Sequence, residues 1–159
     1  MEKIGFGTDI HRLVAGRPLV IGGVTVESDL GADGHSDADV LMHAAADAVL
    51  GALALGDLGM HFPTDEEQWR NAESSQFLRY AVGLIKERGF KISNFDSVVH
   101  LERPKLRSHI DTMRANLAAA LEVDIDQVSV KAKTGEGLDA VGERRAVSAQ
   151  AIVLLRIGS

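Results

Sequence analysis

Hydrophobic and polar residues alternate along several short stretches of the chain, and a period of two is typical of half-buried strands. In residues 3–13, Ile4 and Phe6 alternate with glycines, which predicts a strand. Alternating apolar positions also predict strands over residues 92–101 and 128–133. The first strand is notable because polar residues continue its alternation at its far end.

Residues 17–28 predict a β-hairpin. Apolar runs flank the pair Gly22-Gly23, and paired glycines are typical of tight hairpin turns. Residues 144–157 predict a long final strand, although the Ala-rich part is also compatible with a helix. Residues 149–155 are apolar on both faces, so both faces require cover, from helices or from another subunit. An oligomer with its sheets facing inward is consistent with this pattern.

Three helices are predicted between these strands. Ser36 begins the first, because Asp39 three residues later completes an S-x-x-D capping pattern, and an Ala-rich stretch continues the helix to about Leu55. The other predicted helices cover residues 74–88 and 108–122, and the predicted loops cover residues 56–65 and 135–142. Helices alternating with mostly antiparallel strands predict a layered α+β fold, with one mixed sheet covered by helices on one side. Residues 1–159 form one predicted domain, since no repeat or shift in composition divides them.

Composition narrows the function classes. The 159 residues are 45% hydrophobic and 25% charged, which is ordinary for a soluble globular protein. The net charge of −6 argues against nucleic acid as the main partner, although a local basic pocket for a phosphorylated small molecule remains compatible with it. No apolar run reaches ~18 residues and the start lacks a signal-peptide pattern, so we expect a cytoplasmic protein without a membrane partner. The chain has no cysteine, so any metal ion must be held by histidine and carboxylate groups.

Asp9, His11 and His43 are the candidate metal ligands. Asp9 and His11 are two residues apart on a predicted strand, so their side chains point to the same face. His43 lies on the first predicted helix. Together they could hold one zinc-type ion, and three protein ligands leave a fourth position open, as in catalytic sites. The alternative is a surface turn carrying ordinary polar residues.

Further polar residues surround these candidates on the predicted helix. Asp39 and Asp47 lie one turn on either side of His43, and either could orient its imidazole from the second coordination shell. His35 and Ser36 precede the helix, where backbone N–H groups attract phosphate. A plain N-cap role is the alternative for Ser36.

Two later segments also carry candidate chemistry. After the strand at 128–133, Thr134 could donate to a phosphate oxygen and Glu136 could bind a hard cation such as Mg²⁺. A turn with solvated charges is the alternative, and no P-loop motif is present. In the other segment, Pro104 frees backbone groups that could read a nucleobase edge, unless the segment only connects a strand to a helix.

The chain resembles the 2-C-methyl-D-erythritol 2,4-cyclodiphosphate synthase family along essentially its whole length. The motifs that carry the resemblance are G-x-G-x-D-x-H-R-L at 5–13, G-H-S-D-A-D-V-L-x-H-A-x-x-D-A-x-L-G-A at 34–52, G-D-x-G-x-H-F-P at 56–63, E-R-P-K-L at 102–106 and V-K-A-K-T-x-E at 130–136. The resemblance implies a homotrimer with a site at each subunit interface. It also implies zinc on Asp9, His11 and His43, with a second ion, Mg²⁺ or Mn²⁺, on Glu136.

The resemblance further implies the reaction and the residues around the substrate. The implied substrate is 4-diphosphocytidyl-2-C-methyl-D-erythritol 2-phosphate, a cytidine diphosphate derivative. Its own 2-phosphate would attack the β-phosphorus and release CMP, in the non-mevalonate isoprenoid pathway. The implied catalytic residues are His35 and Thr134. The implied substrate-binding residues are Asp9, His11, His35, Ser36, Asp57, Leu58, Gly59, Phe62, Asp65, Glu66, Leu101, Arg103, Pro104, Lys105, Leu106, Arg107, Lys133, Thr134, Gly135 and Glu136.

Two departures from the family pattern stand out. Where the family usually has F-P-D-T-D, Thr64 replaces the first acid. Where it usually has T-G-R-G-E, Glu143 stands in place of the arginine and Arg144 follows it. Two other classes of protein are therefore kept as alternatives. One is a zinc phosphoesterase that uses metal-bound water, and the other is a trimeric ligand-binding module without catalysis.

Overall fold

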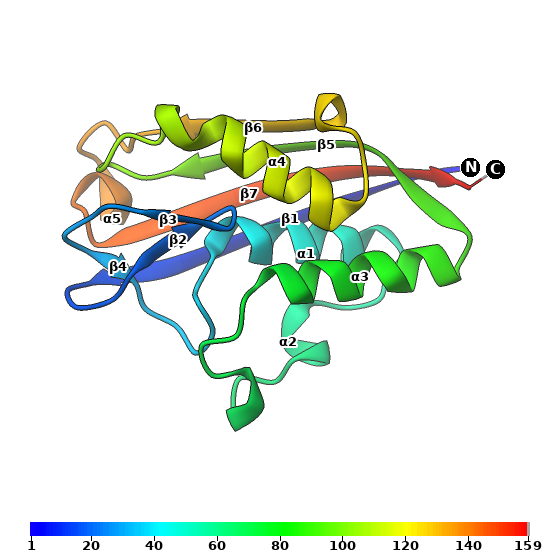
Figure 1. Cartoon of the computed structure of the whole chain (residues 1–159), viewed down its shortest axis with the longest axis horizontal. Helices are drawn as coiled ribbons and strands as arrows, with labels where there is room; N and C mark the ends of the chain where they lie inside the picture. The colour runs from blue at the N-terminus through cyan, green and yellow to red at the C-terminus, as the bar shows by residue number, and fades with distance from the viewer. Residues whose placement is uncertain (159) are drawn as a thin grey trace.

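The computed structural model of the protein describes residues 1–158 and contains one mixed five-stranded sheet (Figure 1). The strands are β1 (Glu2–Val14), β2 (Leu19–Ile21), β3 (Val24–Val26), β4 (Gly31–Ala32), β5 (Phe90–His100), β6 (Val128–Lys133) and β7 (Ala146–Ile157). The strand order in the large sheet is β4-β1-β7-β5-β6, and β2 pairs with β3 in a separate ribbon. Only the β5–β6 pair is parallel among these strands. The predicted mixed, mostly antiparallel α+β fold is therefore confirmed.

Three long helices cover one face of the sheet (Figure 1). The helices are α1 (Val40–Ala52), α2 (Leu58–His61), α3 (Ser75–Glu87), α4 (Ile110–Leu121) and α5 (Asp139–Gly142), and 3-10 turns occupy Glu67–Trp69, Arg107–His109 and Ile125–Gln127. Helix α3 is amphipathic and buries Phe77, Leu78 and Ile85 on one side. Helix α1 is buried along most of its length, because it lies between the sheet and α3.

The predicted start of the first helix is wrong by several residues. Helix α1 begins at Val40, and Asp39 is its N-cap, because the Asp39 carboxylate accepts hydrogen bonds from the backbone N–H groups of Leu41 and Met42. Ala38 has a φ of 56°, so the chain is not helical between Ser36 and the cap. Asp39, which the S-x-x-D pattern places inside the helix, is thus the residue that caps it.

The two predicted loops each contain one helical turn. Asp57 caps α2 by accepting from the N–H of Met60, and Asp139 at the start of α5 accepts from the N–H of Val141. Both turns are too short to leave a hydrophobic period in the sequence. The hairpin prediction is confirmed, because Gly22 and Gly23 both have positive φ at the turn between β2 and β3.

Glycines on β1 allow α1 to lie directly against the strand. A Cβ added to Gly5 would lie 1.8 Å from the Ala48 carbonyl oxygen, and one added to Gly7 would lie 2.1 Å from that of Ala44. Side chains at these positions would therefore push the helix away. Further along the same face of β1, where the alternation reaches Asp9, the N-terminal half of α1 lies opposite the strand.

On the other face of the sheet, residues 1–158 place no helix, and apolar side chains are exposed there. Ile4, Phe6, Ile10 and Ile152 are 72%, 60%, 61% and 48% exposed, and we call this set the open sheet face. Phe6 and Ile152 are cross-strand neighbours on β1 and β7, so the apolar surface is continuous between these strands. The prediction that the final strand requires cover on both sides is met within the chain on one side only. Among the described residues, no helix has the length and apolar character needed to span a membrane.

The glycine packing predicts a strong effect of one methyl group. We expect Gly7→Ala to lower the free energy of unfolding by about 2 kcal/mol, because the methyl group would overlap the α1 backbone. Gly83→Ala is the matched control, since a Cβ at this helical glycine meets nothing within 4 Å. The control is expected to stabilise the protein by about 0.5–1 kcal/mol. Urea unfolding of both variants measures the difference, and equal stability of the two would contradict the packing argument.

Candidate active site

Asp9, His11 and His43 converge at the end of β1. His11 Nε2 lies 2.7 Å from Asp9 Oδ2, His43 Nδ1 lies 3.0 Å from the same oxygen, and the two ring nitrogens are 3.2 Å apart. Strand β1 supplies two of these groups and the first turn of α1 supplies the third. The close packing of α1 on β1 therefore brings together groups that are 34 residues apart in sequence.

The three ligand atoms have the spacing that a tetrahedral metal site requires. Zinc bonds of ~2.0–2.1 Å place two ligand atoms of a tetrahedron about 3.3 Å apart. The observed separations are slightly shorter, and all three groups offer one atom within 4.8 Å of one another. The side chains keep 13–25% of their surface exposed, so a further ligand can approach from solvent. The cluster could hold a metal ion, with two nitrogen donors and one carboxylate oxygen.

Hydrogen bonds behind the imidazoles determine which ring nitrogens face the cluster. His11 Nδ1 lies 2.9 Å from the backbone carbonyl oxygen of Asp33. A carbonyl oxygen only accepts, so Nδ1 carries the proton and Nε2 presents its lone pair to the cluster. His43 Nε2 lies 2.7 Å from Ser74 Oγ. Sequence reasoning missed Asp33 and Ser74, because both contacts join residues far apart along the chain.

The two acids expected to orient His43 have other partners. The Asp39 carboxylate accepts from the N–H groups of Gly22 and Gly23 in addition to those at the start of α1. Asp47 Oδ1 accepts from the N–H of Leu58, 2.7 Å away. Asp39 thus links the hairpin turn to α1, and Asp47 links α1 to α2. The hydrogen bonds described for these two acids go to backbone N–H groups and not to the His43 ring, so an orienting role for them stays a prediction.

Charge interactions shift the pKa values of two cluster residues in opposite directions. Burial alone would raise the pKa of Asp9, but hydrogen bonds and positive charge from His11 and His43 lower it from 3.8 to about 2. Burial would lower the pKa of His11, but the hydrogen bond and charge of Asp9, with the Asp33 carbonyl, raise it above 6.5. Both shifts favour the charged form of the group, so a metal ion that binds His11 Nε2 competes with a proton at that atom.

His35 and Ser36 lie beside the cluster but not at a helix start. His35 Nε2 contacts the Glu66 carbonyl oxygen at 2.9 Å. Ser36 is buried, and its Oγ lies 3.2 Å from His43 Nε2. A phosphate site at the N-terminus of α1 is not supported, because the Asp39 carboxylate already accepts from the helix N–H groups there.

The segment after α2 folds around an aromatic cluster. The Phe62 ring packs 4.5–5.0 Å from those of Trp69, Phe77 and Tyr80, measured between ring centroids. Glu66 accepts from the indole N–H of Trp69 at 3.0 Å, while Asp65 is exposed. Phe62 thus packs within this aromatic cluster, and Asp57, Leu58 and Gly59 belong to the capped turn of α2.

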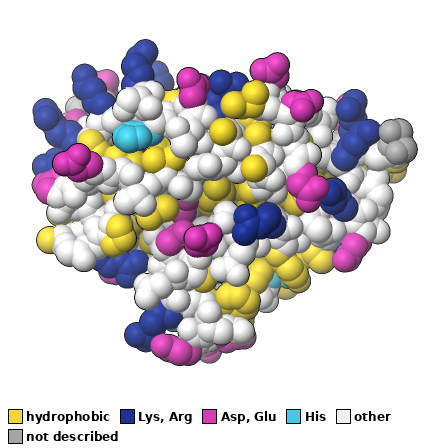
Figure 2. All heavy atoms as spheres, viewed as in Figure 1, with side chains coloured by type: hydrophobic (Ala, Val, Ile, Leu, Met, Phe, Trp, Pro, Cys, Tyr) yellow, Lys and Arg dark blue, Asp and Glu magenta, His cyan; other side chains and the backbone are white. Residues whose placement is uncertain are grey.

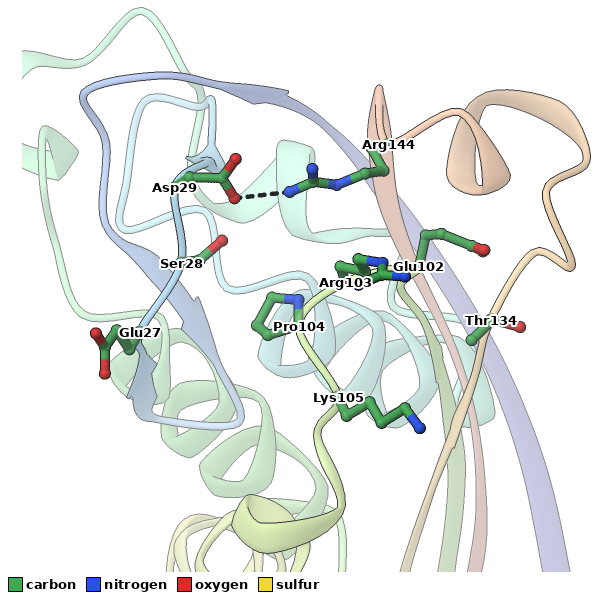
Figure 3. Close-up of a pocket in the computed structure, with 9 residues that line it drawn as sticks. All are labelled: Glu27, Ser28, Asp29, Glu102, Arg103, Pro104, Lys105, Thr134 and Arg144. Carbon is green, nitrogen blue, oxygen red and sulfur yellow. Dashed lines mark hydrogen bonds and ion pairs between the residues drawn. The ribbon is translucent and has the colours of Figure 1, made fainter.

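Two adjoining cavities lie where β5 and β6 end. One, of about 620 Å³, is lined by Leu101, Glu102, Pro104, Lys105, Leu106, Arg107, Ile110, Asp111, Val130, Lys131, Ala132, Lys133 and Thr134. The other, of about 980 Å³, is lined by Glu27, Ser28, Asp29, Glu102, Arg103, Pro104, Lys105, Thr134 and Arg144 (Figure 3). Basic side chains outnumber acids in the first, and Figure 2 shows Lys and Arg gathered at this end of the molecule.

These cavities collect most of the residues predicted to bind the nucleotide end of a substrate. Thr134 lines both cavities, and its Oγ1 lies 3.4 Å from Glu136 Oε1. The N–H of Gly135 donates to Glu102 Oε2 at 2.8 Å, which holds the two loops together. Neither cavity is lined by Asp9, His11 or His43. Within one chain, the metal-ligand cluster and the cavities are therefore separate places.

Residues at and after the departure at Glu143 form two ion pairs. Arg145 contacts Glu143 Oε2 at 2.7 Å, and Arg144 contacts Asp29 Oδ1 at 2.6 Å across the larger cavity (Figure 3). Relative to the family pattern, Glu143 stands in place of the arginine and Arg145 in place of the glutamate, so the two positions carry opposite charges to those of the pattern. The Arg144 side chain points to Asp29 (Figure 3).

The fold and the cluster together define an α+β enzyme with a candidate metal centre. The YgbB family profile matches residues 2–156. The 2-C-methyl-D-erythritol 2,4-cyclodiphosphate synthase of Salinibacter ruber is 56% identical over 149 residues, which cover 94% of this chain and 95% of that protein. The chain therefore belongs to the YgbB family.

Two solved structures place the fold among known ones. A CDP-bound form of a 2C-methyl-D-erythritol-2,4-cyclodiphosphate synthase matches with a TM-score of 0.89 and 42% identity, covering 97% of this chain and all of that one. The bifunctional IspDF of Campylobacter jejuni matches with a TM-score of 0.94 and 35% identity. That match covers 99% of this chain but only 42% of the bifunctional one.

The shifted pKa values predict how the metal-free protein responds to pH. Protonated His11 stabilises the fold below pH 6.5, and this contribution is lost as the pH rises through its raised pKa. Asp9 contributes above pH 3.8 and loses its contribution only as the pH falls toward about 2, so it is constant near neutrality. We expect the melting temperature in EDTA to fall as the pH rises above 6.5. His11→Ala should flatten this dependence, and parallel curves for the two proteins would contradict the assignment.

Proposed function

We propose that this chain converts 4-diphosphocytidyl-2-C-methyl-D-erythritol 2-phosphate to 2-C-methyl-D-erythritol 2,4-cyclodiphosphate and CMP, in the non-mevalonate isoprenoid pathway. The observation that carries the proposal is the convergence of Asp9, His11 and His43 in a chain of the YgbB family. The 56% identity to a cyclodiphosphate synthase extends over nearly the whole length of both proteins. A match of that extent includes the cluster and the cavity loops alike.

Zinc is the ion we propose for the three-residue cluster. Two imidazole nitrogens and one carboxylate oxygen suit zinc, and the open side of the cluster suits a catalytic site. When bound there, zinc supplies a Lewis acid for a phosphoryl oxygen of the substrate. For Glu136 we propose Mg²⁺ or Mn²⁺, since an exposed carboxylate beside a phosphate-binding hydroxyl is a suitable ligand for a hard cation.

The proposed assembly is a homotrimer with the open sheet faces turned inward. An exposed apolar surface of this kind on a folded chain is typical of a protein–protein interface. Ile4, Phe6, Ile10 and Ile152 supply that surface. The separation between the metal-ligand cluster and the cavities supports a site completed by two subunits, in which one supplies the cluster and its neighbour supplies the nucleotide cavity.

The proposed substrate contacts divide between these two regions. The first group consists of the cluster residues Asp9 and His11, of His35 and Ser36 before α1, and of Asp57, Leu58, Gly59, Phe62, Asp65 and Glu66 in and after α2. The second group lies in the cavity loops and consists of Leu101, Arg103, Pro104, Lys105, Leu106, Arg107, Lys133, Thr134, Gly135 and Glu136. Backbone groups on either side of Pro104 are the proposed readers of the cytosine edge. Lys105, Arg107 and Lys133 lie in the same cavity and supply positive charge for the diphosphate.

The proposed mechanism needs positioning and charge neutralisation more than proton transfer. The substrate carries its own nucleophile, an anionic 2-phosphate, which attacks the β-phosphorus as the bond to CMP breaks. Thr134 donates a hydrogen bond to a phosphoryl oxygen as charge develops there. His35 presents a ring N–H that contacts the Glu66 carbonyl in the free chain and can transfer to a phosphate oxygen. No Ser–His–Asp arrangement is required.

Product analysis tests the reaction and separates it from the other classes of protein. With the authentic substrate and Mg²⁺, we expect ³¹P NMR to show the cyclic diphosphate and CMP, and chelator to stop turnover. A linear product would instead indicate hydrolysis by a zinc phosphoesterase. Binding without any CMP release would indicate a ligand-binding module.

His43→Ala tests the metal cluster within that assay. We expect turnover to fall at least 10³-fold and zinc content to fall with it, because the cluster loses one of its three ligands. His109→Ala, on the turn before α4, is the control and should keep both properties. A zinc-replete, fully active His43→Ala protein would contradict the assignment.

Phe6→Glu tests the proposed trimer. A charge in the middle of the open sheet face cannot be buried without a partner, so we expect subunits to separate. Light scattering should give the 17.0 kDa of one chain for the variant and three times that mass for the wild type. Ile125→Glu, which changes an exposed apolar residue outside the sheet, should leave the wild-type mass unchanged. A monomeric wild type would contradict the proposed assembly.

A further inference from the structure

A chain of hydrogen bonds leads from His43 to Ser74 and Asp37, two residues to which the proposed mechanism gives no role. His43 Nε2 lies 2.7 Å from Ser74 Oγ, and Ser74 Oγ is hydrogen-bonded in turn to Asp37 Oδ1. Asp37 also accepts from the backbone N–H groups of Ser74 and Asp39, at 3.0 and 3.1 Å. Ser74 is fully buried, so water cannot replace these contacts.

The Asp37 carboxylate determines which group donates and which accepts in each of these hydrogen bonds. An ionised Asp side chain accepts hydrogen bonds and donates none, so Ser74 must donate its hydroxyl proton to Asp37. The Ser74 oxygen is then left with lone pairs toward His43, and Nε2 must be the protonated nitrogen. Ser36 Oγ, 3.2 Å from Nε2, accepts from the N–H of Ala38 and agrees with this direction. In the neutral imidazole of His43, Nδ1 therefore faces Asp9 and His11 with a free lone pair, and this is the form of the ring that binds a metal ion.

Ser74 is at a helix N-cap, but its hydroxyl does not cap the helix. Ser74 is the N-cap residue of α3, where a serine side chain normally accepts from the first N–H groups of the helix. Its side chain makes no capping hydrogen bond here. Asp37 bonds to both the N–H and the hydroxyl of Ser74, and the hydroxyl contacts His43 instead of the helix.

We propose that Asp37 and Ser74 are positioning residues that hold His43 in the Nε2–H tautomer, so that Nδ1 is ready to bind metal. This inference rests on the proposed metal site at Asp9, His11 and His43. Second-shell partners of this kind typically change metal affinity by ~10–100-fold. The two positioning residues lie before α1 and before α3, so the arrangement of these two helix starts is linked to metal binding.

Zinc affinity of the full-length protein, measured by competition with a chromophoric chelator, tests the inference. Ser74→Ala should weaken zinc binding by at least 10-fold, because Nε2–H loses its acceptor. Asp37→Asn should weaken it at least as much. Its amide can donate to Ser74, which turns the hydroxyl toward Nε2 and favours the Nδ1–H tautomer.

The matched control is Ser97→Ala. Ser97 is also a buried serine, but its hydroxyl donates to the Ser129 carbonyl oxygen in the sheet. We expect this variant to lose stability without losing zinc affinity. In the metal-free proteins, ¹⁵N NMR of the His43 ring should report Nε2–H in the wild type and a shift toward Nδ1–H in Asp37→Asn, which a purely structural role would not produce.

The outcomes separate this inference from the proposed function. A wild-type protein that binds zinc, with Ser74→Ala and Asp37→Asn binding equally well, would overturn the positioning role alone. An unchanged His43 tautomer in Asp37→Asn would do the same. A wild-type protein that binds no zinc would overturn the proposed metal site together with this inference.

Discussion

The contact between the backbone of α1 and the glycines of β1 is the constraint on which the rest of the structure depends. Gly5 and Gly7 leave no side chain between the strand and the carbonyl oxygens of the helix. The resulting distance is what brings His43 to Asp9 and His11. The Ala-rich composition of α1 follows from the same requirement, because small side chains let the helix lie between the sheet and α3. The same contact between α1 and β1 thus determines both the packing of the core and the geometry of the site.

Much of the fold could be predicted from periodicity and turn residues. The alternation around Phe6 defines β1, and the same period of two is enough to place Asp9 and His11 on one face of the strand. The glycine pair at 22–23 identifies the hairpin because both positions have positive φ. The convergence of His43 on this strand could not be derived from spacing, since it depends on how α1 crosses β1. The family motifs provided that information.

Errors and omissions arose where one pattern fits two local structures or where a partner is distant in sequence. The S-x-x-D pattern fits both a helix that starts at Ser36 and a helix that is capped by Asp39. The positive φ of Ala38 excludes the first, but this backbone angle is known only from the structure. Asp47 lies one turn from His43, yet the approach of α2 gives it the Leu58 N–H as partner. Ser74 could have been noticed only as a polar residue at a helix start. Its contact with Asp37 spans 37 residues of sequence.

The carboxylate of Asp39 has a consequence for how the chain folds. It is almost completely buried. It accepts hydrogen bonds from backbone N–H groups of two segments, which are the turn at Gly22 and Gly23 and the first turn of α1. Such a buried carboxylate is tolerated only because donors from both segments surround it, since burial with either set missing would be unfavourable. The hairpin turn and the first turn of α1 therefore stabilise each other through a single side chain.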